Sequence, residues 1–208
     1  MLDQPELTRF PVSWLTQYGP EEIRVLTLLQ DLQALDAGGA TDQELADRLG
    51  LTRNGVNRII LRLEDRDLDW SGLVRSTSTE RGSYAGKYRE VRPVPEDTDL
   101  ITVPMRARDQ LRGLHFMLYG ALSQWDSTGE AVTIAQISAA CATIPHTARR
   151  TIGQLVDAGW VTQTRTPHGR GMFFYVLHDD GQPDVTSQAG QGGASPVRRG
   201  AAEGRRAE

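Results

Sequence analysis

The sequence predicts a mainly α fold with small β-hairpins, an α+β class, in which one unit of structure occurs twice. Each half of the chain contains two short amphipathic helices, and four apolar positions of the first pair recur 92 residues later in the second pair. A strand, a turn-rich segment and a second strand follow each helix pair. The matching positions are Leu45, Val56, Ile60 and Leu63 in the first copy and Ile137, Ala148, Ile152 and Leu155 in the second.

The composition is that of a soluble globular protein large enough for two small domains. The chain has 208 residues, of which 38% are hydrophobic and 24% charged. No apolar run approaches the ~18 residues of a membrane-spanning helix, and the first residues show no secretory signal. The single cysteine, Cys141, has no partner for an internal disulfide. We therefore expect a cytoplasmic protein without a membrane partner.

The charge is unevenly distributed along the chain. The net charge of −4 disfavours a nucleic-acid partner, because phosphate contacts require Lys and Arg. Between residues 48 and 92, however, basic side chains are concentrated where a DNA-binding surface is expected. They are Arg48, Arg53, Arg58, Arg62, Arg66, Arg75, Arg81, Lys87, Arg89 and Arg92.

Capping signals place the helices of the first copy. Pro20, followed by two glutamates, predicts a helix that ends at Gly38. Thr41 and Glu44 form a capping box for a short second helix that ends before Gly50. A third helix begins after the capping residue Thr52 and carries a buried stripe at i, i+3, i+4 and i+7.

These signals divide the chain into five parts. We predict an N-terminal arm at 1–19, a first domain at 20–92, a linker at 93–104, a second domain at 105–180 and a disordered tail at 181–208. The longest apolar stripe, from 105 to 125, predicts one continuous helix. Whether that helix only joins the units or also forms a homodimer remains open.

The exposed face of the third helix carries the residue types that read DNA. Arg pairs with guanine and Asn with adenine in the major groove, and cations on a hairpin can contact the backbone or the minor groove. The predicted DNA-binding residues of the first unit are Thr52, Arg53, Asn54, Asn57, Arg58 and Arg62 on the helix and Arg81, Lys87 and Arg89 on the hairpin. A solvated arginine-rich face is the alternative.

The second unit has fewer donors at the corresponding positions. Its candidates are His146, Thr147, Arg149 and Arg150 on the helix and Arg165, His168 and Arg170 on the hairpin. Because this surface carries less charge, protein packing is the competing interpretation of the second unit.

The segments Thr41–Leu63 with Leu73-Val74, and Thr133–Leu155 with Gly159-Trp160-Val161, resemble the winged helix-turn-helix of MarR-like and related bacterial regulators. This resemblance implies two tandem winged helix-turn-helix domains, in each of which the second helix of the motif enters the major groove and the hairpin acts as a wing. The chain departs from the pattern in two ways. Both units lie in one chain, and the first copy has a longer, acidic segment between Leu63 and the hairpin.

Catalytic motifs are lacking in the sequence. The four histidines and Cys141 do not have the short paired spacings of a zinc site, and neither a phosphate-binding loop nor a nucleophile elbow occurs. We therefore expect no enzyme activity, no metal and no cofactor.

The function expected from these features is sequence-specific binding of double-stranded DNA by a nucleoid-associated transcriptional regulator. One alternative is a plasmid or phage replication initiator or partition protein. An alternative of another class is a winged-helix protein-interaction subunit of a chromosome-condensation-type complex. The operator, the direction of regulation, the oligomeric state and any small-molecule effector remain open.

Overall fold

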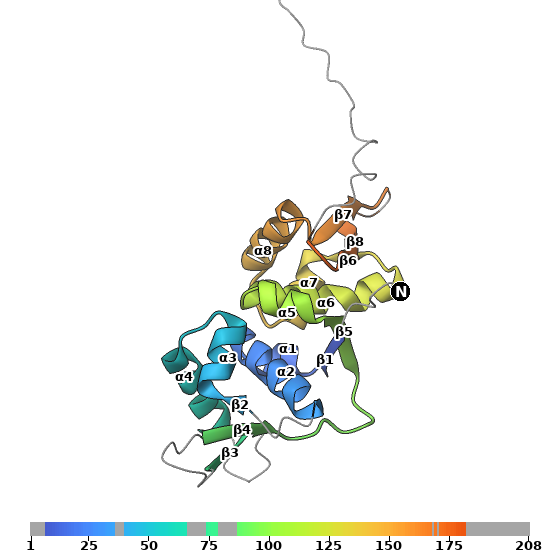
Figure 1. Cartoon of the computed structure of the whole chain (residues 1–208). Coiled ribbons are helices and arrows are strands. Elements are labelled where there is room, and N and C mark those ends of the chain that lie inside the picture. Colours follow the sequence, from blue (N-terminus) through green and yellow to red (C-terminus); the bar gives the residue numbers. More distant parts are fainter. Residues whose placement is uncertain are drawn as a thin grey trace, which may run out of the picture.

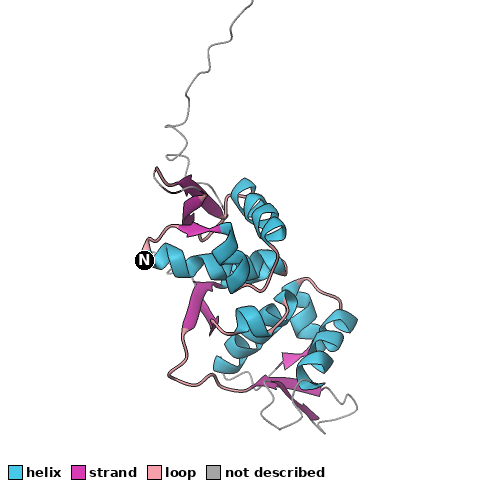
Figure 2. Cartoon of the chain, turned by 180° about the vertical axis from the view of Figure 1, so that it is seen from behind, coloured by secondary structure: helices cyan, strands magenta, loops and turns pink. Residues whose placement is uncertain are grey.

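The computed structural model describes residues 7–35, 40–65, 74–78, 87–167, 169 and 171–181. The chain forms two lobes, each with its helices packed around a small sheet, and a two-stranded ribbon lies where the lobes meet (Figures 1 and 2). The predicted disordered tail lies outside the described residues, apart from Gly181. Among the described residues, no helix is long and apolar enough to cross a membrane.

Over its described residues, the first lobe contains three helices and a three-stranded antiparallel sheet. Its elements in chain order are α2 (Pro20–Ala34), β2 (Ala40–Thr41), α3 (Asp42–Leu49), α4 (Arg53–Asp65), β3 (Val74–Ser78) and β4 (Lys87–Val91). The strand order is β2-β4-β3, so β4 is the central strand and pairs with both neighbours.

The second lobe repeats this order of elements. It contains α6 (Leu114–Thr128), β6 (Val132–Thr133), α7 (Ile134–Ala140), α8 (Pro145–Asp157), β7 (Val161–Arg165) and β8 (Met172–Leu177), with the strand order β6-β8-β7. Two consecutive helices followed by two paired strands are therefore present in both halves of the chain.

Most helix ends follow the capping signals in the sequence, but α2 ends at Ala34, before the glycine at position 38 that was expected to end it. Pro20 is the first residue of α2, and the Gly19 N–H donates to Glu22 Oε2 at 2.8 Å. Thr41 and Glu44 form the expected capping box, in which the Glu44 N–H donates to Thr41 Oγ1 at 3.2 Å. Gly50 ends α3 with a φ of 63°, a left-handed conformation that favours glycine.

The repeated apolar positions form the core of both lobes. None of the eight side chains is more than 2% exposed, so the stripe read from the sequence is the buried face of each helix pair. The buried residues are Leu45, Val56, Ile60 and Leu63 in the first lobe and Ile137, Ala148, Ile152 and Leu155 in the second.

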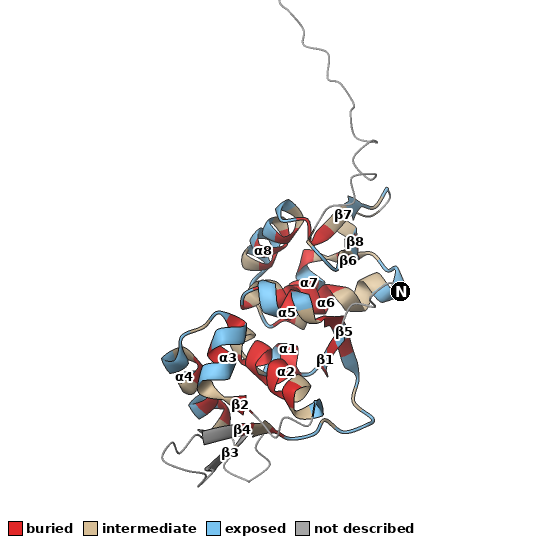
Figure 3. Ribbon diagram, viewed as in Figure 1, coloured by how far each residue is buried: buried red, intermediate tan, exposed pale blue. Residues whose placement is uncertain are grey.

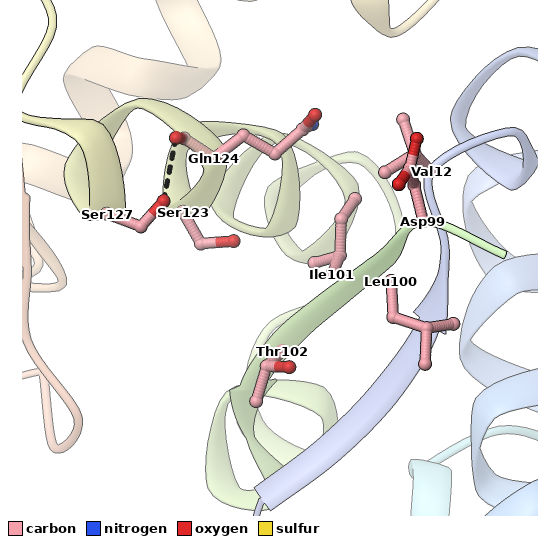
Figure 4. A pocket seen from close by; sticks show the side chains of 8 residues that line it. All are labelled: Val12, Asp99, Leu100, Ile101, Thr102, Ser123, Gln124 and Ser127. Atoms are coloured by element: carbon pink, nitrogen blue, oxygen red, sulfur yellow. Dashed lines mark hydrogen bonds between the residues drawn. The ribbon is translucent and has the colours of Figure 1, made fainter. Parts of the chain in front are cut away.

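The N-terminal arm and the end of the predicted linker form the two-stranded ribbon. Strand β1 (Leu7–Pro11) pairs antiparallel with β5 (Leu100–Pro104), and the short helix α1 (Trp14–Gln17) follows β1. Figure 4 shows Leu100, Ile101 and Thr102 of β5 near Ser123 and Gln124 of α6. The extended linker expected at 93–104 is therefore a paired strand over its last residues.

The single helix predicted from 105 to 125 is wrong. The structure has two helices there, α5 (Met105–Gln110) and α6, and the chain turns between them at Gly113, whose φ is 42°. Leu111 and Leu118 are both buried, as in a continuous helix, although the backbone changes direction between them. The apolar spacing therefore does not reveal the break. The signal for the break was Gly113 itself, since glycine tolerates positive φ.

Candidate nucleic-acid interface

Helix α4 presents a polar face on the side opposite the core. Arg53, Asn54 and Arg58 are exposed, while Val56, Ile60 and Leu63 pack inward (Figure 3). At 100° per residue, Asn54, Arg58 and Leu61 form the line that points most directly away from the buried stripe. Leu61 is 46% exposed, so an apolar side chain lies within this polar face.

Thr52 is part of the helix start. Its hydroxyl accepts a hydrogen bond from the Gly55 N–H at 3.1 Å, as the sequence predicts for a capping residue. Because this contact is local, Thr52 fixes where α4 begins and hence which side chains face outward.

Two of the predicted DNA-binding side chains have contacts within the protein. Asn57 is half-buried, and its Oδ1 accepts from Arg89 Nη2 at 3.5 Å. The Nε of Arg62 lies 3.4 Å from Glu22 Oε1 on α2, although 62% of the Arg62 side chain is exposed. Both residues lie beside the open surface formed by Arg53, Asn54 and Arg58.

Arg89 requires a correction, because it lies inside the first lobe and not on a DNA-facing surface. It is 2% exposed, and it donates to both carboxylate oxygens of Asp42, at 2.9 and 3.2 Å. It also donates to Glu64 Oε1 at 3.1 Å and contacts the hydroxyl of Ser76. We call Arg89, Asp42, Glu64 and Ser76 the Arg89 cluster.

Arg89 is buried because side chains alternate between the two faces of β4. Val91 belongs to the core, and residues two apart on a strand face the same side, so Arg89 also points inward. This signal was available in the sequence. The acidic partners were not, since Asp42 begins α3 and Glu64 lies near the end of α4, far from Arg89 along the chain.

The Arg89 cluster joins the hairpin to the helix-turn-helix. A guanidinium that binds a carboxylate through two parallel hydrogen bonds holds it with a defined orientation. In this cluster one side chain of β4 contacts α3, α4 and β3 together. The position of the hairpin relative to α4 is therefore fixed by an interior ion-pair network.

The remaining hairpin candidates lie mostly outside what the structure describes. This applies to Arg81, His168 and Arg170, and to the side chain of Lys87. Arg165, at the end of β7, is exposed.

The second lobe presents fewer arginines on its equivalent helix. His146, Arg149 and Arg150 are exposed on α8, and Thr147 is half-buried. Ile144, immediately before α8, is 64% exposed. Helices α4 and α8 lie on the same side of the molecule in both opposite views (Figures 1 and 2).

The strand registers show what replaces the Arg89 cluster in the second lobe. Ala40 pairs with Arg89 and Val132 pairs with Phe173, so Phe173 is the counterpart of Arg89. The 92-residue shift makes Ile134 and Val156 the counterparts of Asp42 and Glu64. The positions that carry an ion-pair network in the first lobe therefore carry apolar residues in the second.

A protein-family model matches part of the chain. Residues 22–68 match the family described as winged helix-turn-helix DNA-binding. This segment covers most of α2 and all of α3 and α4, including the exposed face of Arg53, Asn54 and Arg58. The first lobe therefore contains a DNA-binding winged helix-turn-helix.

Comparison with solved structures gives distant likenesses. The DIP2311 protein from Corynebacterium diphtheriae is 17% identical with a TM-score of 0.25, over 67% of this chain and 23% of that one. ScpB from Mycobacterium tuberculosis is 16% identical with a TM-score of 0.22, over 74% of this chain and 91% of that one. At these TM-scores neither likeness establishes a shared fold. No curated protein matches the sequence.

Proposed function

We propose that this protein is a transcriptional regulator that binds double-stranded DNA at specific sequences through two tandem winged-helix units. The observation that carries the proposal is the exposed face of α4, where Arg53, Asn54 and Arg58 project from a helix within the matched winged helix-turn-helix segment. Guanidinium and amide groups on such a helix can form bidentate hydrogen bonds with base edges in the major groove.

Each side chain of this face has a distinct proposed role. Asn54 and Arg58 lie farthest from the core and read base edges, Asn54 an adenine and Arg58 a guanine. Leu61 lies one turn further along the same line, where an apolar contact with a thymine methyl is available. Arg53 lies at the first turn and contacts either a base or the neighbouring phosphate.

The other candidates have supporting roles. Arg62 is drawn toward Glu22, so we assign it to the phosphate backbone at the edge of the groove. Arg81 and Lys87 belong to the wing in this proposal, on the strength of their sequence positions alone. In the second unit, His146, Arg149 and Arg150 form the corresponding face of α8.

The test is selection of binding sites from a random duplex library, followed by shift assays at one fixed salt concentration. We expect one enriched motif, and Arg58→Ala should weaken its binding while reducing preference at one base position. Arg9→Ala is the matched control, because it removes the same charge from the exposed side of β1, away from α4 (Figure 1). Equal binding by wild type and both variants would overturn the assigned face.

A second candidate function is a protein-interaction subunit of a chromosome-condensation-type complex. Exposed apolar side chains on the second unit favour it, namely Ile144 at 64%, Val176 at 49% and Phe174 at 39% exposure. Aliphatic and aromatic side chains at a surface favour protein partners over phosphates. Failure to bind any duplex at low salt, together with co-purification of a partner that Phe174→Ser releases, would favour this candidate.

A further inference from the structure

Two arginines are buried where the lobes meet. Arg24 of α2 is fully buried, and Arg108 of α5 is 3% exposed. Helix α2 contacts α6 across this boundary, and α3 contacts α5. We call this region the inter-lobe seam; it consists of α2 and α3 on one side, α5 and α6 on the other, and β1.

Arg24 binds three elements through one guanidinium. Its Nε donates to the backbone oxygen of Arg108 at 3.0 Å, and its Nη2 donates to the backbone oxygen of Leu49 at 3.2 Å. Its Nη1 pairs with Glu21 at 2.8 Å. Because Leu49 is the last residue of α3, Arg24 links the turn that precedes α4 directly to α5.

Arg108 of α5 in turn contacts α2. Its side chain pairs with Asp31 on α2, and its Nε donates to Asp109 Oδ1 at 2.8 Å. Burial raises the pKa of Asp31, while Arg108 opposes that rise. A desolvated ion pair of this kind depends on its geometry, because either charge left alone in the interior is costly.

The apolar part of the seam is closely packed. The ring of Phe10 on β1 lies against that of Phe116 on α6, with ring centroids 5.5 Å apart and ring planes tilted by 45°. A Cβ added to Gly120 of α6 would lie 2.7 Å from Phe10 Cζ, so that helix approaches the arm as closely as a glycine allows. A Cβ on Gly113 would lie 3.0 Å from Glu21 Oε1 on α2. The side chains of Phe10, Phe116 and Glu21 therefore fill the space between the two lobes.

Directional hydrogen bonds and close packing together leave the seam little freedom to slide or rotate. We propose that it holds α4 and α8 at one fixed separation and orientation, so that the protein binds two half-sites on duplex DNA at a single spacing. The proposal rests on the function proposed above for α4 and α8. Both helices lie along the same edge of the molecule in these two views, and in this proposal one duplex follows that edge (Figures 1 and 2).

A flexible tether predicts the opposite behaviour. Two units joined only by a loose linker act through effective concentration and tolerate a range of half-site spacings. The loop at 92–99 is exposed for most of its length and lies outside the seam. Lengthening this loop should therefore have no effect on the preferred spacing if the seam sets it.

The first test measures the geometry without DNA. Spin labels at Asp47→Cys and Asp157→Cys, both exposed positions outside the proposed DNA-binding residues, report the distance between the lobes by pulsed electron paramagnetic resonance. We expect one narrow distance distribution that is unchanged by a short Gly-Ser insertion between Glu96 and Asp97. A broad distribution in the labelled wild-type background, or one that broadens on insertion, would overturn the proposal.

Arginine variants test the cause of the rigidity. Arg24→Met combined with Arg108→Met should broaden the distribution in a chain that still shows a cooperative thermal transition. An unchanged narrow distribution in that folded variant would overturn the role of the arginines. If the variant does not fold, the wild-type and insertion measurements still decide the proposal.

The second test uses duplexes that carry two copies of the selected motif at separations covering about two helical turns. We expect one separation to bind at least about tenfold more tightly than the others, in wild type and insertion variant alike. Equal binding at every separation would overturn the fixed spacing while leaving DNA binding intact. Failure to select any motif would instead overturn the proposed function.

Discussion

Inside the first lobe, Arg89 on β4 donates two hydrogen bonds, of 2.9 and 3.2 Å, to the carboxylate of Asp42 at the start of α3. The pair ties the central strand of the sheet to the helix-turn-helix. In the second lobe the counterpart positions hold the apolar residues Phe173 and Ile134. The two lobes thus differ in the chemistry of these positions, and this difference can be tested by exchange.

Arg89→Phe alone should strongly destabilise the protein. It leaves Asp42 and Glu64 facing an apolar ring, and breaking a buried ion pair by removing one partner costs about 3–5 kcal/mol. The measurement is the free energy of unfolding from urea denaturation. A loss below about 1 kcal/mol would show that the cluster is solvated and energetically minor.

The triple variant Asp42→Ile, Glu64→Val and Arg89→Phe should recover most of that loss. It installs the residues of the second lobe, and apolar replacement of a complete buried ionic group is often neutral or stabilising. The single Arg89→Phe variant is its matched control. If the triple variant is no more stable than the single one, the two sites are not physically equivalent.

Arg58→Ala and Arg81→Ala should have different effects on DNA binding. Loss of a base-reading side chain should cost about 1–3 kcal/mol of binding and relax preference at one base position. Loss of a wing cation should weaken binding to all DNA sequences alike. It should also reduce the slope of the logarithm of the binding constant against the logarithm of the salt concentration by roughly one. Shift assays across a salt series with matched and mismatched duplexes separate the two effects. Identical behaviour of both variants would contradict the assigned roles.

Two helical glycines should respond oppositely to alanine. Gly120→Ala forces a methyl against the buried Phe10 ring and should cost about 1–3 kcal/mol through overpacking. Nothing lies within 4 Å of a Cβ added to Gly153 of α8, so Gly153→Ala should stabilise by about 0.5–1 kcal/mol through helix propensity. Thermal unfolding measures both. If Gly120→Ala stabilises the protein, the Phe10 ring moves aside with no loss of stability, which contradicts the close packing.

Cys141 should be unreactive in the folded protein. Burial raises the pKa of its thiol to about 12, and the residue is 2% exposed. At pH 8 such a thiol is ionised in roughly one molecule in 10⁴. Ellman's reagent should therefore react slowly in buffer and rapidly in denaturant, and fast labelling of the native protein would contradict the burial.

The same thiol links stability to alkaline pH. Because its pKa is higher in the folded state than the ordinary ~8.5 of the unfolded chain, its contribution to stability is fully present below pH ~8. That contribution is lost as the pH rises above ~8.5, when the unfolded chain releases the proton first. Cys141→Ala should show a smaller fall in stability over this range than wild type. Parallel pH profiles would contradict the shift.

The sequence predicted the features of the fold that depend on local patterns. The buried stripe of Val56, Ile60 and Leu63 is set by helical spacing, and the start of α3 by the Thr41 capping box. These signals span a few residues, so they can be read without tertiary information. They were enough to identify α4 and its outward face.

The features that were missed depend on contacts between distant residues. The acidic partners of Arg89 lie elsewhere in the chain, and Arg24 and Arg108 look like ordinary surface arginines until α2 and α5 meet. The pairing of β1 with β5 likewise has no local sequence signal. The outward face of α4 could therefore be read from the sequence, while the attachment of α4 to the rest of the molecule required the structure.

The pairing of β1 with β5 also sets an order of events during synthesis. Leu7 aligns with Pro104 and Pro11 with Leu100, so almost the whole first lobe leaves the ribosome before the arm finds its partner strand. Closing so long a loop is slow compared with forming local helices. Until α6 emerges, Phe10 lacks the neighbouring Phe116 ring, and Trp14 is the ring already available for it to stack on. The first lobe can begin to fold early, but its N-terminal end docks only after half of the chain has been translated.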